Sequence, residues 1–268
     1  MALLSHAITL NSYIACSCQH VTHTTLRTIP HYLNYQRRQE EPGFRPIPSH
    51  QFGSKTVHIT GPDTIMGNIW RSQRLIFRPV ETSDEQFLES MNQYGSDSFQ
   101  NATHRLPVPQ GKAGASGYRE VLQGALLGCI ICLPGPAKPD VTTTNGNAAV
   151  PETIPIGTIA LPAVDPQRSH HRNTSVAVSI AHPYQSQGYG GEAILWVLEW
   201  AFQHANLHRV SIGAFAFNEG AVRLYQRLGF VLEGRTREAA WHNGKYHDTI
   251  EMGMLRDEWR ELYGKTTT

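Results

Sequence analysis

Regular patterns of apolar and polar positions begin only near residue 70 of this chain. Short stretches with the character of β-strands lie at 74–79, 156–161 and 175–180, and another reads RVSIGAF. Ahead of RVSIGAF, apolar residues recur with a helical period from about Gly190 to Ala205. The inner stripe of this predicted helix consists of Ala193, Ile194, Val197, Leu198, Ala201, Phe202 and Ala205.

Local end signals predict two further helices and a hairpin. After the first strand, a capping box is predicted from Thr82 or Ser83 with Glu85 or Gln86. In NEGAVRLYQRLGF, Asn218 is the predicted N-cap, and Gly229 is the predicted end of the helix, where the backbone turns left-handed. The segment His-Asn-Gly at 242–244 is typical of a turn between two antiparallel strands.

Together these elements predict an α/β (α+β) fold with a mixed, mostly antiparallel central sheet flanked by helices. We expect one domain over residues 70–262, with a loop insertion at 134–153, where Pro, Thr and Asn are frequent. Residues 1–65 show no sustained periodicity, so no folded domain is predicted there.

The composition of residues 1–65 leaves two interpretations open. No acidic residue occurs before Glu40, whereas Arg27, Arg37 and Arg38 do, which is compatible with a mitochondrial transit peptide. We favour a disordered extension, or upstream sequence joined to a start at Met66, because the arginine content is modest. A cytoplasmic location is therefore expected, and a mitochondrial one if the segment is a transit peptide.

Charge and cysteine placement narrow the function classes. The chain has 268 residues and a formal net charge of +1, so neither nucleic acid nor an anionic membrane is an expected partner. No apolar run reaches the length of a membrane span. Cys129 and Cys132 lie three apart in a predicted strand, which directs them to opposite faces and excludes a disulfide or a shared metal. We expect no metal site.

A glycine cluster opens the long predicted helix, in the segment Gln185–Gly191. The unpaired amides and the positive dipole end of a helix N-terminus form an anion site. Gly188 and Gly190 remove Cβ atoms that would otherwise collide with a ligand. Because Glu192 follows the glycines, the segment lacks the ending of a Walker loop, and the spacing of a dinucleotide fingerprint is also absent.

The pattern continues downstream with the motif Asn218-x-x-Ala221-x-x-Leu224-Tyr225-x-x-x-Gly229-Phe230. Together with GYGGEAI, LHRV and NEGAVRLYQRLGFVLEGRTRE, it resembles the GCN5-related N-acetyltransferase (GNAT) superfamily, in particular its ribosomal-protein-alanine acetyltransferase-like branch. WRSQRLIFRPVETSDEQF is similar to the start of the same domain. The resemblance covers about residues 70–259 and implies the GNAT acyl-CoA N-acyltransferase fold, with acetyl-CoA as the acetyl donor.

By motif position, the resemblance implies a set of residues that bind coenzyme A. The loop would hold the diphosphate through Gln185, Gln187, Gly188, Tyr189, Gly190 and Gly191. The predicted strand that precedes this loop, at 175–180, would pair its backbone with pantetheine through Val176, Val178 and Ile180. Asn218 would reach the pantetheine arm while capping its helix. Many relatives carry Arg where this chain has Gln185, so binding here would depend more on main-chain amides.

Tyr225 matches the position of the family's proton donor. A phenol beside a thioester can protonate the thiolate that an attacking amine expels. The alternative is an ordinary core tyrosine, because Ala221, Leu224 and Leu228 share its helical face.

The attacking amine must be neutral, which at pH 7 costs an alkyl amine about 4–5 kcal/mol and an α-amine about 1–1.4 kcal/mol. A base or a water relay is therefore expected, but no single residue is indicated. The candidates for the base are Glu152, His170, His171, Glu233, Glu238, His242 and His247.

These observations predict an acetyl-CoA-dependent N-acetyltransferase that moves an acetyl group to a primary amine by direct attack. The amine belongs to a protein N-terminus or to a small molecule, and no cysteine occupies a motif position that would suit a covalent intermediate. Two alternatives stay open: a catalytically inactive acyl-CoA-binding sensor or scaffold, and an enzyme that binds a nucleotide phosphate with the same loop. The sequence does not specify an oligomeric state.

Overall fold

The computed structural model describes residues 68–91, 106, 108, 111–136 and 152–264. The predicted segment 1–65 and most of the predicted 134–153 loop lie outside the described residues. The elements that position the site are β1 (Ile76–Arg78), the 3-10 helix η3 (Thr82–Asp84), α2 (Glu85–Met91), α4 (Lys112–Gln123), β2 (Leu127–Pro134), β3 (Thr153–Leu161), β4 (Asn173–Ser175), β5 (Ala177–Ile180), α5 (Tyr189–Glu199), β6 (Arg209–Phe215), α6 (Glu219–Arg227), β7 (Val231–His242), β8 (Lys245–Leu255) and α7 (Arg256–Tyr263).

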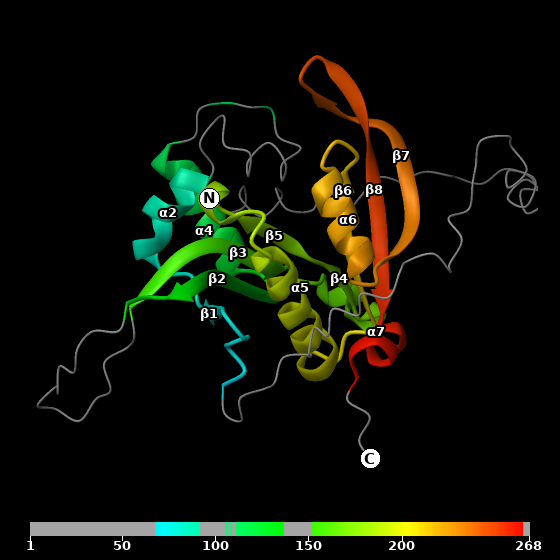
Figure 1. The fold of residues 1–268 in the computed structure, drawn as a ribbon, viewed down its shortest axis with the longest axis horizontal. Helices are drawn as coiled ribbons and strands as arrows, with labels where there is room; N and C mark the ends of the chain where they lie inside the picture. The colour runs from blue at the N-terminus through cyan, green and yellow to red at the C-terminus, as the bar shows by residue number, and fades with distance from the viewer. Residues whose placement is uncertain (1–67, 92–105, 107, 109–110, 137–151, 265–268) are drawn as a thin grey trace, which may run out of the picture. The chain divides into compact units, whose positions relative to one another are not determined.

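The strands form two four-stranded sheets rather than one central sheet. The first has the order β1-β2-β3-β5 and the second has the order β4-β6-β8-β7. Every pairing is antiparallel except that between β4 and β6. Figure 1 shows the first sheet on the left and the long β7–β8 hairpin of the second on the right. The predicted mixed, mostly antiparallel sheet flanked by helices is confirmed.

The predicted single strand at 175–180 is divided into two pieces that belong to different sheets. β4 pairs with β6, whereas β5 pairs with β3. Between them, the Val176 amide donates to the Ser211 carbonyl at 2.8 Å. Beyond this bond the two sheets separate, because β5 follows β3 while β6 continues beside β8. We call this point of separation the fork.

One large hydrophobic core lies on the side of the sheets that carries α5 and α6. Six of the seven residues predicted for the inner stripe of α5 and its continuation are buried, and Ala205 is partly buried. They pack with Val210 and Ile212 of β6 and with Met252 and Met254 of β8. After Glu199 the helix continues as a π-helical turn, Trp200–His204. Because α5 contacts residues of both sheets, it fixes the geometry of the fork.

The chain that leads into β1 is anchored on α5 by Trp196. The indole nitrogen of Trp196 donates to the Ile69 carbonyl at 2.8 Å. Its ring stacks on Phe77 with centroids 3.6 Å apart, and Trp70 packs against it at 6.3 Å. These contacts join residues that are about 120 positions apart in sequence, so β1 and α5 form one packing unit.

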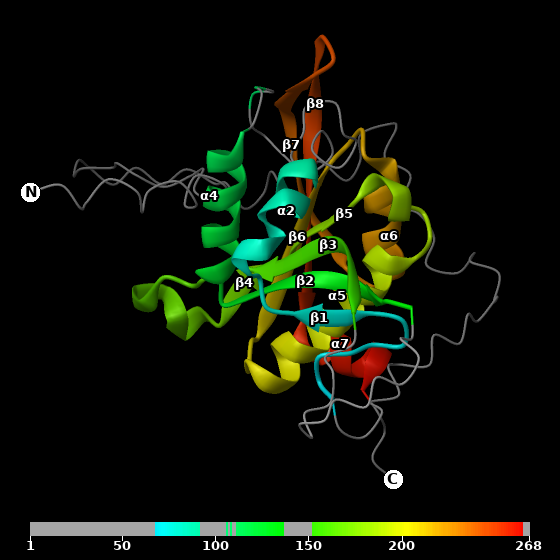
Figure 2. The same ribbon diagram turned by 90° about the vertical axis from the view of Figure 1, so that its left-hand side faces the viewer.

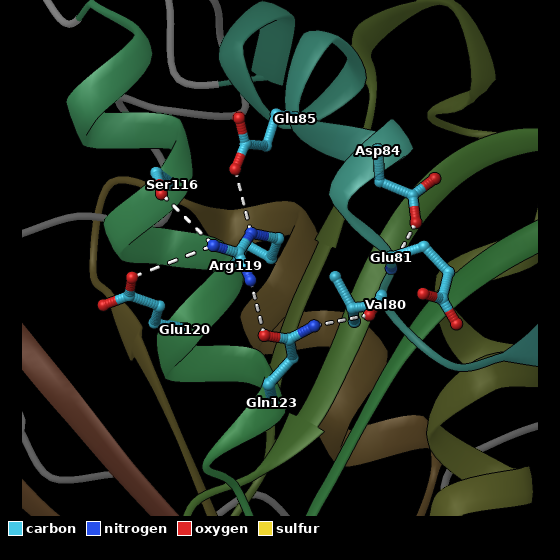
Figure 3. Close-up of polar contacts among 8 residues, drawn as sticks. All are labelled: Val80, Glu81, Asp84, Glu85, Ser116, Arg119, Glu120 and Gln123. Carbon is cyan, nitrogen blue, oxygen red and sulfur yellow. Dashed lines mark hydrogen bonds and ion pairs between the residues drawn. The ribbon is translucent and has the colours of Figure 1, made fainter.

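Helices α2 and α4 pack over a second, smaller core on the other face of the first sheet (Figure 2). Arg119 of α4 joins them, donating to Glu85 at 2.9 Å and to Gln123 at 2.7 Å, and Gln123 in turn donates to the Val80 carbonyl at 2.8 Å (Figure 3). Cys132 belongs to this core and Cys129 to the large one, so the prediction that they occupy opposite faces is confirmed.

The predicted helix caps and the predicted turn are correct in the second half of the chain. In the first half, the predicted capping box lies at other residues than expected. Asn218 caps α6 through its side chain, Gly229 follows α6 with φ +82°, and Asn243-Gly244 turns the hairpin with both φ values positive. The first capping box is formed by Glu81 and Asp84, not by the predicted residues. Asp84 occupies this position because the Arg78 guanidinium holds its carboxylate at 2.6 Å, an ion pair that the local pattern does not reveal.

Candidate active site

The glycine segment forms the tight entry to α5. Gly188 is the N-cap of α5 and has φ +85°, a left-handed conformation that side chains with a Cβ adopt only with strain. Ser186 also has a positive φ, of 59°. The first amides of α5 point out of the helix end without partners in the helix, which is the geometry expected of an anion site.

Gly191 has a packing role beside the role predicted for it, whereas Gly190 does not. A Cβ on Gly191 would lie 3.2 Å from Leu224, and one on Gly190 would lie 3.7 Å from Ile180. The absence of a side chain at Gly191 therefore allows α5 to approach α6 closely. At Gly190 the space is ordinary for a methyl group, so packing alone does not require glycine there.

Arg74 lies beside the glycine segment, a contact that no local sequence pattern indicates. Its guanidinium pairs with Glu192 at 2.7 Å, donates to the Gln187 carbonyl at 3.1 Å and lies over the Tyr189 ring at 4.6 Å. A Cβ on Gly188 would lie 3.2 Å from Arg74 Nη2. A cation therefore sits at the predicted anion site although Gln occupies position 185. The signal is not local, because Arg74 is 118 residues before Glu192.

The three strand residues predicted to face pantetheine share one edge of the chain. Val176 directs its amide towards β6, whereas Ala181 directs its amide to the Ile156 carbonyl of β3. Because backbone groups alternate along a strand, Val178 and Ile180 direct theirs to the same edge as Val176, into the fork. The Gln185 side chain donates to the Ile180 carbonyl at 2.8 Å, so it braces the loop against β5.

Asn218 lies at the end of β6, close to the widening side of the fork. Its side-chain oxygen accepts a hydrogen bond from the Ala221 amide at 3.1 Å. This contact confirms the predicted cap and leaves the side-chain NH₂ group as a donor. Gln187 donates to the Pro183 carbonyl at 2.9 Å, so its side chain, like that of Gln185, is engaged within the loop.

Tyr225 lies on α6 and belongs to the large core. It is 8% exposed, and its ring packs near Phe230 with centroids 6.2 Å apart. Burial removes water from the hydroxyl and raises its pKa to about 12. The phenol is therefore neutral at physiological pH and has a proton to donate.

The predicted base candidates are dispersed. His170 and His171 lie exposed in a 3-10 turn before β4, with ring centroids 3.9 Å apart. Glu233 forms a close ion pair with Arg209. Glu238 lies in the β7 bulge, and Glu152 just precedes β3.

The two hairpin histidines differ in their surroundings. The His242 ring stacks on Phe217 at 4.2 Å, and the His247 ring meets Phe217 edge-on at 4.9 Å. Among the described residues, His247 Nε2 is a buried side-chain atom without a hydrogen-bond partner. The rings of His242 and His247 also meet edge-on, with centroids 6.0 Å apart, so the structure brings these two predicted bases together on the hairpin.

Two features, a metal centre and a membrane-spanning helix, are absent from the described residues. These residues contain no group of three or more His, Cys, Asp or Glu side chains that could hold a metal ion. No helix in this part of the chain combines the length and apolar character needed to cross a membrane.

Comparison with known proteins finds N-acetyltransferases among the similar sequences. Spermidine N(1)-acetyltransferase of Vibrio cholerae is 33% identical over 89 residues, which is 33% of this chain and 51% of that protein. YdaF of Bacillus subtilis, named as a ribosomal N-acetyltransferase, is 30% identical over 89 residues, 33% of this chain and 49% of that protein. The chain thus spans about half the length of the curated relatives it matches.

At the level of the fold, the crystal structure of spermidine N-acetyltransferase from Vibrio cholerae in complex with CoA and spermine is similar, with a TM-score of 0.55. It is 22% identical and covers 69% of this chain and 98% of its own. The acetyltransferase (GNAT) domain family matches residues 74–231, which is more than half of the chain. With the glycine segment, the fork and the Asn218 cap all inside that range, the chain belongs to the GNAT family of acetyltransferases.

Proposed function

We propose that this protein transfers an acetyl group from acetyl-CoA to a primary amine by direct attack of the amine on the thioester. The observation that carries the proposal is the placement of the helix-opening glycine segment beside the fork. A diphosphate at the first amides of α5 and a pantetheine arm in the fork would form one continuous path. The family membership of residues 74–231 supports the same donor.

Cofactor binding would rest on main-chain groups of two elements. The amides of Gln187, Gly188, Tyr189, Gly190 and Gly191 would hold the diphosphate, with Arg74 beside them. Val178 would offer the edge of β5 that faces away from β3 to the pantetheine amides, in the manner of an added strand, while the Ile180 carbonyl already accepts from Gln185. Asn218 would donate its side-chain NH₂ group to the same arm.

Tyr225 would stabilise the leaving thiolate from the side of the large core. With a pKa of about 12, full proton transfer to a thiolate of ordinary pKa 8.5 is uphill by about 5 kcal/mol. Tyr225 would therefore act first as a hydrogen-bond donor to the developing negative charge. Transfer of the proton would follow as the bound thioester changes the surroundings of the phenol.

Two classes of acceptor are supported by the relatives. Spermidine N(1)-acetyltransferase suggests a polyamine, and YdaF suggests a protein N-terminus. The α-amine of a protein is neutral for a larger fraction of the time at pH 7, so it needs less help from a base than an alkyl amine does.

The test is an acceptor screen with acetyl-CoA that measures thiol release together with the acetylated product. Spermidine, spermine and short peptides with free N-termini form the first panel. Amine-dependent thiol release with an acetylated amine is the expected result. Tight CoA binding without turnover on any amine would instead favour the inactive acyl-CoA sensor. Displacement of CoA by ATP would favour the nucleotide enzyme.

A further inference from the structure

The second sheet has one face that does not carry the large core. Val210 and Ile212 of β6 and Met252 and Met254 of β8 point into that core, so the residues between them point the other way. On β8 one of these is Glu251, which lies opposite Gly213 of β6 in the strand register. We call the side of the sheet that carries Glu251 the outer face.

Glu251 reaches over β6 just beyond the fork. A Cβ on Gly213 would lie 3.2 Å from one Glu251 carboxylate oxygen and 3.3 Å from the other, so the missing side chain of Gly213 makes room for the carboxylate. Gly213 is two residues past Ser211, which accepts the last bond between β6 and the β4–β5 segment. Tyr225 packs in the large core, on the opposite side of the second sheet from Glu251.

The charges around Glu251 favour a carboxylate that can accept a proton. Glu233 faces it from β7 and Arg209 faces it from β6. Partial burial raises the pKa of Glu251 above its ordinary value, Glu233 raises it further, and Arg209 opposes both. Arg209 is already in a close ion pair with Glu233. Within the described residues, the structure gives the Glu251 carboxylate no hydrogen bond, so its oxygens stay available.

We infer that Glu251 is the general base of the proposed reaction, and that it receives a proton from the acceptor ammonium group on the outer face. The inference rests on the proposed function. A pair of carboxylates there would also attract a cationic amine before it is deprotonated. Base and acid would then act from opposite sides of the fork, with the thioester between them.

The proton balance is complete without another reactant. Of the three ammonium protons, one passes to Glu251 and then to solvent, and the nitrogen lone pair forms the C–N bond. The tetrahedral adduct expels the thiolate as the C–S bond breaks with its electron pair. Tyr225 gives its proton to the thiolate, and a second proton from the nitrogen returns the Tyr225 phenolate to its neutral form by way of solvent. The third stays on the amide.

The deciding experiment compares Glu251→Gln with the wild type from about pH 6 to pH 9. A base that deprotonates the ammonium makes kcat/KM for an alkyl amine nearly independent of pH in this range. Without the base, kcat/KM should follow the fraction of free amine and rise about tenfold per pH unit. We expect a loss of about 100-fold near pH 7 that shrinks steadily towards pH 9.

Two further variants and one binding measurement separate this role from a structural one. Glu251→Asp should restore part of the activity, and Glu261→Gln, an exposed carboxylate on α7, should behave as wild type. Affinity for CoA should be the same in all of them. Equal losses at every pH, or full activity of Glu251→Gln, would overturn the inference alone. A wild type that acetylates no amine would overturn the proposed function, and the inference with it.

Discussion

The two sides of the fork are built in different ways. On the core side, the proposed cofactor groups come mainly from three short continuous segments, 176–180, 185–191 and 218–225, and the last two are each tied to the start of a helix. On the outer face, the proposed base depends on strands that meet only in the folded sheet, Gly213 on β6 and Glu251 on β8. Gly191 and Tyr225 of the core side are buried, whereas Glu251 is exposed.

This difference suggests that the two sides have separate functions, cofactor binding on the core side and acceptor selection on the outer face. A cofactor with a fixed structure can be bound by backbone geometry, which a local motif specifies. An acceptor amine is selected by side chains on a strand surface, where single substitutions change charge without changing the fold. The core side should therefore be sensitive to backbone changes, and the outer face should be sensitive to charge and pH.

The largest effect is expected from Gly188→Val. A β-branched residue with φ +85° is strained, and its Cβ would press on Arg74. Affinity for CoA should fall by about 100-fold or more, as measured by calorimetry.

Gly190→Ala is the matched variant for this test. It should fold at least as well as the wild type, because its methyl group finds ordinary contacts and alanine favours helix. A loss of CoA affinity in Gly190→Ala, without a loss of stability, would show that the ligand lies against the backbone at Gly190. Normal affinity in Gly188→Val would remove the loop from the site.

The next largest effect is expected from Tyr225→Phe. The ring and its packing are kept, so CoA affinity should change little, while kcat falls by about 100-fold. Because burial raises the pKa of Tyr225 to about 12, the wild type should show no loss of activity from ionisation of this phenol below about pH 10. A parallel loss of CoA affinity would identify Tyr225 as a packing residue.

Smaller effects on CoA affinity are expected from substitution of Arg74 and Glu192, which form an ion pair at the glycine segment, and the two substitutions should act in opposite directions. Arg74→Gln leaves the Glu192 carboxylate uncompensated beside a diphosphate, which should weaken CoA binding about three- to fivefold. Glu192→Gln frees the guanidinium and should strengthen binding by a similar factor at low salt. Pantetheine, which lacks the diphosphate, should bind both variants as it binds the wild type. Equal effects on pantetheine would show that the pair only stabilises the loop.

The smallest effect is expected from Gly213→Ala on the outer face. The added methyl group would lie 3.2 Å from the Glu251 carboxylate and should displace it by a few tenths of an ångström. We expect kcat to fall about two- to threefold with unchanged CoA affinity. An unchanged kcat would argue that the position of Glu251 does not matter to the reaction.

Local patterns predicted most of the elements and part of the site. The helical stripe of α5, the Asn218 cap and the turn at Asn243-Gly244 were all readable, because each depends on residues a few positions apart. The resemblance, and not a local pattern, pointed to Val176, Val178 and Ile180, and their role towards pantetheine stays a prediction.

Long-range contacts explain what the sequence did not show. The division of the strand at 175–180 arises from pairing with β3 and β6, which no local pattern encodes. The displaced first cap depends on Arg78, and Arg74 meets Glu192 across 118 residues. The sequence does not indicate Glu251, because an acidic residue in IEMGML resembles a solvated strand position until Gly213 is placed opposite it.

The attachment of Trp196 to Ile69, Trp70 and Phe77 has a practical consequence for shortened versions of the protein. A fragment that started at β1 itself would lack the Ile69 carbonyl, which accepts the indole's hydrogen bond, and Trp70, which packs against the Trp196 ring. The long helix beneath the fork would then be the first part to loosen, although its own residues were untouched. A recombinant version should therefore start upstream of Asn68. Its start is set by the residues that α5 contacts, Ile69 and Trp70, and not by the first residue of β1.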